Sequence, residues 1–141
     1  MKDSLKPGLI FNFQYKVPEN KTVPHLYPDA PEFQEMPQVL ATGFMVGLFE
    51  WTCIQAINSH IDWPREQTVG IAVKLSHLAA TPPGLTVNVM VKLEEVEGRR
   101  LVFHVAAFDQ LEKLAEGENE HIVVSLEGFK KRLQRLRRCV E

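Results

Sequence analysis

Residues 42–58 read TGFMVGLFEWTCIQAIN, and this stretch decides the fold. Its residues are apolar nearly all round, which is typical of a helix that is buried on most sides. Thr42 is the expected N-cap, and Asn58, with Pro64 beyond it, is expected to end the helix. A helix of this kind needs an apolar sheet around it, and the flanking sequence must supply that sheet.

Alternating apolar and polar residues on both sides of the helix predict an antiparallel sheet. The expected strands cover residues 11–17, 69–80, 85–96, 100–109 and 114–125. The turn at 97–99, Glu-Gly-Arg, makes a hairpin of the third and fourth of these strands. The prolines between 18 and 37 exclude a long helix or a central strand there and leave one short turn around 32–36. An irregular segment of this length is usually functional in a compact domain.

The end of the chain is predicted to be an amphipathic helix, because apolar residues recur at helical spacing among basic ones: Phe129, Leu133, Leu136 and Val140. This order of elements is that of the α+β hotdog fold, a curved antiparallel sheet wrapped around one central helix, here with an additional C-terminal helix. We expect residues 1–141 to form a single such domain. A second copy commonly buries the open face of such a sheet, so we expect a homodimer or a dimer of dimers. The basic face of the last helix is interpreted as solvated, with a nucleotide phosphate as the alternative partner.

Composition excludes several classes of function. The chain has 141 residues and a net charge of −2, so neither nucleic acid nor an anionic membrane is an expected partner. Its most apolar run, 39–49, is about half as long as a membrane span. No signal peptide pattern is visible and the two cysteines form no disulfide framework, which predicts a cytoplasmic protein. The histidines and cysteines lack metal-ligand spacing, so no metal is expected.

Glu50 is an unusual residue for its place in the helix. Its helical neighbours are all small or apolar: Gly43, Val46, Gly47, Cys53 and Ile54. An ionised carboxylate among such neighbours is costly unless it is paired or open to a pocket. One interpretation is a core glutamate satisfied by a backbone or water contact, and the other, which we favour, is a functional group.

His77 is the second polar residue in an apolar setting. It shares the strand face that is expected to cover the helix with apolar residues: Ile71, Val73, Leu75 and Ala79. A lone histidine there is most often a hydrogen-bonded core residue. Because Glu50 projects from the helix that this sheet wraps, we expect these two buried titratable groups to satisfy each other, as is typical of active sites.

Thr42 by itself is explained as a helix cap, but the residues that follow it need another reason. Gly43 and Gly47 each lower helix stability by about 1 kcal/mol relative to alanine. They make sense where a group such as a thioester carbonyl approaches the free N–H groups of the helix N-terminus. Along a straight helix Thr42 and Glu50 lie about 12 Å apart, so His77 or a substrate must bridge them.

Four stretches carry a resemblance to a known family: KTVPHLYP at 21–28, PEF at 31–33, ATGFMVGLFEW at 41–51 and ATPPGL at 80–85. The chain resembles the fluoroacetyl-CoA thioesterase family of hotdog-fold acyl-CoA hydrolases over nearly its whole length. The motif around Thr42 and Glu50 is fairly specific, whereas the hairpin alone is not.

The resemblance implies a catalytic set of Thr42, Glu50 and His77. It also implies a contribution to the site from Gly70, a glycine on the strand before the histidine. Phenylalanines in the irregular segment cover the acyl pocket in this family, and here Phe33 matches one while Met36 stands in place of the second. His121 stands where relatives often have an arginine near the thioester or CoA. These departures leave the acyl group open.

The sequence therefore predicts hydrolysis of a short acyl-CoA thioester to the free acid and CoA, with no further cofactor. Glu50 either activates water or attacks the thioester directly, and the sequence leaves both roles open. One alternative is a hotdog hydratase or dehydratase, which usually carries its acid–base pair in a different sequence context. The other is a non-catalytic acyl-CoA-binding dimer, for which an apolar floor would serve better than Glu50 and His77.

Overall fold

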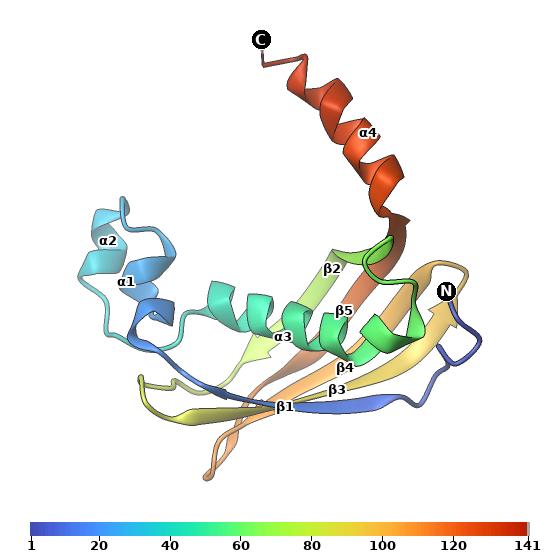
Figure 1. Ribbon diagram of the computed structural model, residues 1–141. Coiled ribbons are helices and arrows are strands. Elements are labelled where there is room, and N and C mark those ends of the chain that lie inside the picture. The colour runs from blue at the N-terminus through green and yellow to red at the C-terminus, as the bar shows by residue number, and fades with distance from the viewer. Residues whose placement is uncertain (141) are drawn as a thin grey trace.

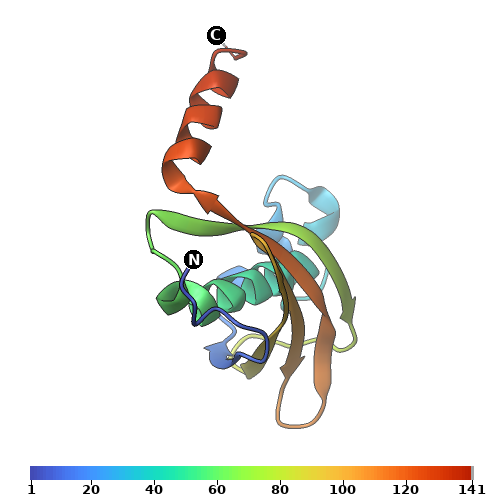
Figure 2. The same cartoon turned by 90° about the vertical axis from the view of Figure 1, so that its right-hand side faces the viewer.

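The computed structural model describes residues 1–140, which form a curved sheet around one long helix (Figure 1). The helix is α3 (Thr42–Ile57), and the antiparallel sheet has the order β1-β3-β4-β5-β2. Its strands are β1 (Ile10–Lys16), β2 (Glu66–His77), β3 (Thr86–Glu97), β4 (Arg100–Phe108) and β5 (Lys113–Ser125). Figure 2 shows the sheet bending around α3, as the sequence predicts for this α+β architecture.

The core lies between α3 and the concave face of the sheet. Met45, Phe49 and Cys53 of α3 are fully buried. They face fully buried residues of the two central strands: Val87, Val89, Val91, Leu93, Leu101, Phe103 and Val105. Alternate residues of β3 and β4 thus supply the apolar surface that the helix requires.

The proline-rich segment contains more structure than the sequence predicts. The turn expected around 32–36 is present as the single-turn helix α2 (Pro31–Gln34). A second single-turn helix, α1 (Val23–Leu26), and the 3-10 turn η1 (Glu19–Lys21) precede it. A proline stands in the first turn of both helices, where its missing N–H leaves no hydrogen bond unmade. A β-bridge between Thr22 and Leu40 closes the base of this segment. We call residues 23–39 the flap.

Two boundary predictions are wrong. The strand expected over 69–80 is β2, which begins at Glu66 and ends at His77. It starts earlier because Glu66 already pairs with Ser125, and it ends where the chain turns toward the proline pair after Thr81. Thr42 is not the N-cap either: Ala41 occupies that position without a side-chain cap, and Thr42 is the first residue of α3. Its hydroxyl is therefore free for another contact.

The C-terminal helix α4 (Leu126–Arg137) follows β5 directly and projects away from the sheet (Figures 1 and 2). Ser125 caps it by accepting a hydrogen bond from Gly128 N–H at 3.2 Å. Its first N–H, on Leu126, donates to the Arg65 carbonyl at 2.9 Å. None of the helices within residues 1–140 combines the length and apolar character that a membrane span requires.

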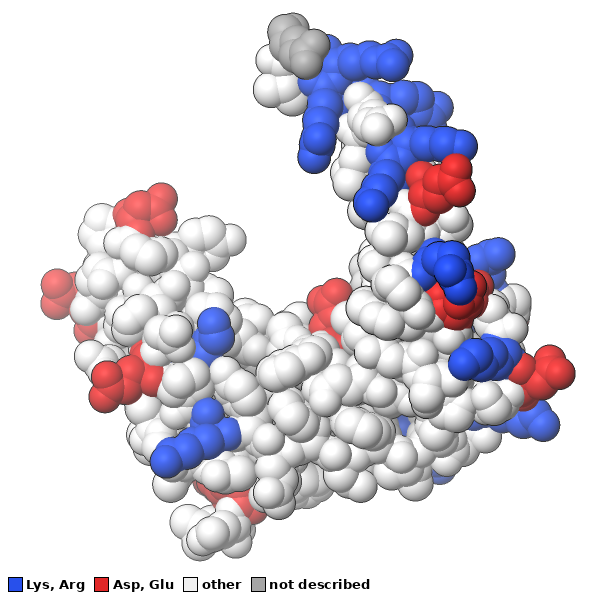
Figure 3. All heavy atoms as spheres, viewed as in Figure 1, with Lys and Arg blue, Asp and Glu red and all other residues white. Residues whose placement is uncertain are grey.

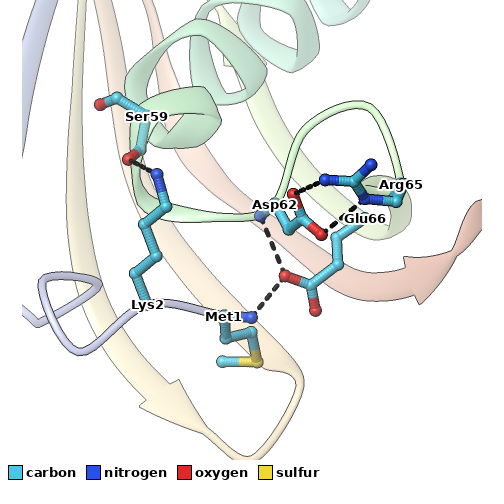
Figure 4. A network of polar contacts seen from close by, with 6 residues as sticks. All are labelled: Met1, Lys2, Ser59, Asp62, Arg65 and Glu66. Carbon is cyan, nitrogen blue, oxygen red and sulfur yellow. Dashed lines mark hydrogen bonds and ion pairs between the residues drawn. The ribbon is translucent and has the colours of Figure 1, made fainter.

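The loop that holds the root of α4 is itself fixed by a polar network (Figure 4). It follows the 3-10 turn η2 (Asn58–His60). Asp62 accepts two hydrogen bonds from the Arg65 guanidinium, at 2.9 and 3.1 Å. The Glu66 carboxylate accepts from the Asp62 N–H at 3.0 Å and pairs with the amino group of Met1. The start of β2 and the root of α4 therefore form one well-connected unit.

Candidate active site

The first contact of the site joins the start of α3 to the end of β2. Thr42 Oγ1 and His77 Nδ1 are hydrogen-bonded at 2.8 Å. The other ring nitrogen of His77, Nε2, is buried without a hydrogen-bond partner in the described chain. The sequence predicted that His77 would approach the helix, and in the structure its contact with the helix is the hydrogen bond to Thr42.

The second contact lies further along the same two elements. A Cβ added to Gly70 of β2 would stand 3.5 Å from the Glu50 carboxyl carbon and 3.6 Å from each carboxylate oxygen. Gly70 therefore leaves the strand backbone open to Glu50. The two pairs, Thr42 with His77 and Glu50 with Gly70, mark the junction of α3 and the edge strand β2.

A β-bulge makes this arrangement possible. The register of β2 against β5 shifts between Gly70 and Ala72, which leaves Ile71 as an extra residue. Without the shift, Gly70 and His77 would lie on opposite faces of the strand, because they are seven positions apart, an odd number. The strict alternation predicted for this strand is wrong at that point. A glycine inside a strand is the sequence signal that would have indicated the bulge.

Glu50 and His77 do not satisfy each other as the sequence predicted. Both side chains are half-buried, and no hydrogen bond or ion pair joins them in the described residues. Glu50 has no hydrogen-bond partner within residues 1–140. Its carboxyl group lies near Gly70 of β2, and without a partner in the chain it is available to a bound water or substrate.

Burial sets the proton affinities around the site. It lowers the pKa of His77, and a backbone contact with Ala79 acts in the opposite direction. His77 is therefore neutral and can accept a proton at neutral pH. Burial also raises the pKa of the Cys53 thiol, and the nearby Glu50 charge adds to this effect. Cys53 thus stays protonated, in agreement with its interpretation as a buried apolar residue rather than a nucleophile.

The flap residues singled out from the sequence lie outside this junction. Phe33 packs against Tyr27, with ring centroids 6.1 Å apart, and Met36 is 46% exposed. Gly43 has a close neighbour that the sequence did not reveal. A Cβ there would stand 3.0 Å from Leu26 of α1, so glycine lets the flap pack on the first turn of α3.

His121 lies on β5, the strand next to β2 in the sheet. It pairs with Gly70 in the register of β2 and β5, and its side chain is 1% exposed. Its Nδ1 is hydrogen-bonded to Thr68 Oγ1 at 3.3 Å, and its ring meets the Phe103 ring edge-on at 5.4 Å. Burial lowers the pKa of His121 to about 4, so the ring is neutral near pH 7.

Acid is expected to destabilise the fold through His121. An unfolded histidine has a pKa near 6.5, so between about pH 6.5 and 4 the unfolded chain binds a proton that the folded chain does not. The free energy of unfolding therefore decreases as the pH is lowered through this range, and this residue contributes at most about 1.4 kcal/mol per pH unit. Denaturant titrations of His121→Gln should show a shallower pH dependence between about pH 6.5 and 4 than those of the wild type. Equal slopes in wild type and His121→Gln would contradict this assignment.

Comparison with known proteins assigns the chain to a family. The model of the family described as fluoroacetyl-CoA-specific thioesterase matches residues 17–127. The chain belongs to this thioesterase family. Within the family, the fluoroacetyl-CoA thioesterase of Streptantibioticus cattleyicolor is 49% identical over 129 residues, which cover 92% of this chain and 92% of that protein.

Solved structures agree with this membership. A structure of the fluoroacetyl-CoA thioesterase is 46% identical, with a TM-score of 0.91, and the match covers 94% of this chain and 98% of that one. A Thermus thermophilus protein described as a thioesterase superfamily member is 26% identical, with a TM-score of 0.80 and 96% of each chain covered. The hotdog fold and the acyl-CoA thioesterase family predicted from the sequence are thus confirmed.

Proposed function

We propose that the protein hydrolyses short acyl-CoA thioesters at the junction of α3 and β2, using Thr42, Glu50 and His77. The observation that carries this proposal is the Glu50 carboxylate, which has no partner within residues 1–140 and lies near Gly70 of β2. The same two elements, α3 and β2, are joined by the Thr42–His77 hydrogen bond. Membership of a thioesterase family supports the same activity. The reaction needs no further cofactor, because CoA is part of the substrate.

Thr42 and His77 hold the carbonyl end of the substrate in this proposal. α3 has no side-chain cap, so its first N–H groups are available to a carbonyl oxygen, where the helix dipole also favours negative charge. The Thr42 hydroxyl, positioned by His77, adds a further donor to the developing oxyanion. The neutral His77 ring relays the proton that the attacking water gives up to the departing thiolate of CoA, either directly or after Glu50 has taken it.

Glu50 supplies the attack on the thioester carbonyl by one of two routes. As a general base it takes a proton from water, the oxygen of that water bonds to the carbonyl carbon, and the thiolate of CoA leaves. As a nucleophile it bonds to the carbonyl carbon itself while the C–S bond breaks and the thiolate of CoA leaves, and water then hydrolyses the resulting anhydride. Both routes need a carboxylate without a strong partner, and Glu50 makes no hydrogen bond or ion pair within residues 1–140.

A second copy of the chain completes the assembly that we propose. β2 is an edge strand, and its residues 70–74 are all exposed, including Ile71 and Val73 at 49% each. An exposed apolar edge of this kind is a template for pairing with another strand. We infer that two copies pair through antiparallel β2 strands.

The free cysteines, buried Cys53 and exposed Cys139, support a reducing cytoplasmic location as part of the proposal.

A panel of acyl-CoA thioesters tests the function directly. We expect the purified protein to release free CoA from short acyl groups such as acetyl, fluoroacetyl and propionyl faster than from long ones. Thiol release is followed at neutral pH. Met36 of the flap is exposed and flexible, so it defines no acyl preference, and the relative rates across the panel identify the preferred acyl group. If no thioester in the panel releases CoA above the buffer rate, the proposed function is wrong.

A further inference from the structure

The helix α4 carries an apolar stripe that nothing in its own subunit covers. Phe129, Leu133 and Leu136 lie on one face of the helix and form this stripe. Their side chains are 39%, 38% and 50% exposed. Figures 1 and 2 show α4 extending beyond the edge of the sheet at which β2 lies. That is the edge through which we infer that a second copy pairs.

Two copies of α4 are unsuited to pack against each other. The stripe has the spacing of a coiled-coil seam, with apolar residues at 126, 129, 133, 136 and 140. The residues that flank the seam are basic: Lys130, Arg132 and Arg137. Pairing two such helices would bring like charges together along both flanks, which is destabilising. The stripe therefore needs a different surface of the partner.

The root of α4 is far from the site of its own subunit. Ser125 pairs with Glu66 at the first residue of β2, while His77 is the last residue of that strand. At about 3.3 Å per residue these ends are roughly 35 Å apart. α4 has 12 residues and is about 18 Å long, so it does not reach back to the Thr42–His77 pair.

Antiparallel pairing of two β2 strands reverses this relation. It places the Glu66 end of one strand beside the His77 end of the other. The α4 helix of one subunit then stands next to the flap and the Thr42–His77 pair of its partner. Figure 1 shows the flap and α4 at opposite ends of α3, so a two-fold axis through the middle of β2 exchanges their places.

We propose that α4 completes the partner's site: its apolar stripe packs on the partner subunit, and Lys130, Arg132 and Arg137 bind the phosphate groups of CoA held there. This inference rests on the proposed function and on the β2 pairing. Figure 3 shows basic side chains gathered over α4. Within residues 1–140 these three cations have no ion-pair partner, and of the cations on the other face only Lys131 has one, Glu127 at 3.4 Å. What distinguishes Lys130, Arg132 and Arg137 is their position beside the apolar stripe. Unpaired cations beside a packed stripe suit a phosphate ligand.

Two charge-matched variants test the contact. The stripe variant is Lys130→Gln/Arg132→Gln/Arg137→Gln, and the control is Lys131→Gln/Arg135→Gln/Arg138→Gln, which removes as many charges from the face away from the stripe. Calorimetry with free CoA should show that the dissociation constant of the stripe variant is about tenfold higher than that of the wild type, or higher still. The control should bind CoA with nearly the wild-type dissociation constant. Pantetheine, which lacks the nucleotide and its phosphates, should bind all three proteins alike.

Subunit mixing shows from which chain the cations come. A heterodimer is purified from a Glu50→Gln chain with intact α4 and a stripe-variant chain with intact Glu50. Its active site, in the stripe-variant chain, should have the wild-type KM for acyl-CoA, because α4 comes from the other chain. A KM equal to that of the stripe-variant homodimer would place the contact within one subunit and overturn the proposal.

The remaining outcomes are also decisive. Light scattering that gives a monomer at assay concentration overturns the inference, as do equal losses of CoA affinity in the two charge variants. Failure of the proposed function looks different, because wild-type protein then neither releases CoA from thioesters nor binds free CoA. Binding of free CoA that is lost only in the stripe variant supports the α4 contact whichever acyl group is hydrolysed.

Discussion

Glu50→Gln is expected to lower kcat for acyl-CoA hydrolysis by about a thousandfold, because the amide can neither accept a proton from water nor attack the thioester. Glu50 makes no hydrogen bond in the described chain, so its replacement breaks none. The unfolding midpoint should therefore stay at or above the wild-type value. Rates are measured as thiol release under saturating substrate, and stability by thermal unfolding of the same samples.

Glu118→Gln is the matched control for this variant, since Glu118 is an exposed carboxylate on β5 that forms no ion pair in the described residues. It should retain wild-type turnover. Normal turnover in Glu50→Gln would remove Glu50 from the site. A single turnover in ¹⁸O-labelled water then separates the two routes, because only attack by the carboxylate leaves solvent oxygen in the Glu50 side chain.

His77→Gln is expected to lower kcat/KM by about a hundredfold to a thousandfold. Glutamine can keep the hydrogen bond to Thr42 but cannot exchange a proton at neutral pH. Because Thr42 and His77 are joined at 2.8 Å, they should act as a unit. Thr42→Val/His77→Gln should then lose little more activity than His77→Gln alone. Strictly additive losses would show that the two residues act independently.

The pH profile identifies the role of His77. Burial lowers its pKa below the ordinary value near 6.5, and the proposed mechanism uses the neutral ring. kcat/KM should therefore be constant at neutral pH and fall as the pH drops through a midpoint below about 6.5. This part of the acid limb should disappear in His77→Gln. A midpoint above pH 7, or an unchanged limb in the variant, would contradict the assignment.

The candidate residues of the site could be recognised from the sequence because they break local rules. A carboxylate among small and apolar neighbours and a histidine on an apolar strand face stand out in a single sequence, and both belong to the junction of α3 and β2. Their pairing was not predictable, because it depends on the register of β2 and on where α3 begins. Thr42 lies one position inside the helix, which turns its hydroxyl from a cap into the partner of His77.

The sequence by itself determined the order of the elements and the burial of one helix, and it singled out Thr42, Glu50 and His77 as candidates, because hydrophobic period and residue type are local properties. Only the tertiary structure decided the rest. The bulge after Gly70 rotates that glycine toward Glu50, and Leu26 fills the space beside Gly43. The direction of α4 past the β2 edge follows from contacts between residues distant in the chain, such as Leu126 with Arg65. Such contacts depend on how the strands are paired in space, and no local pattern records them.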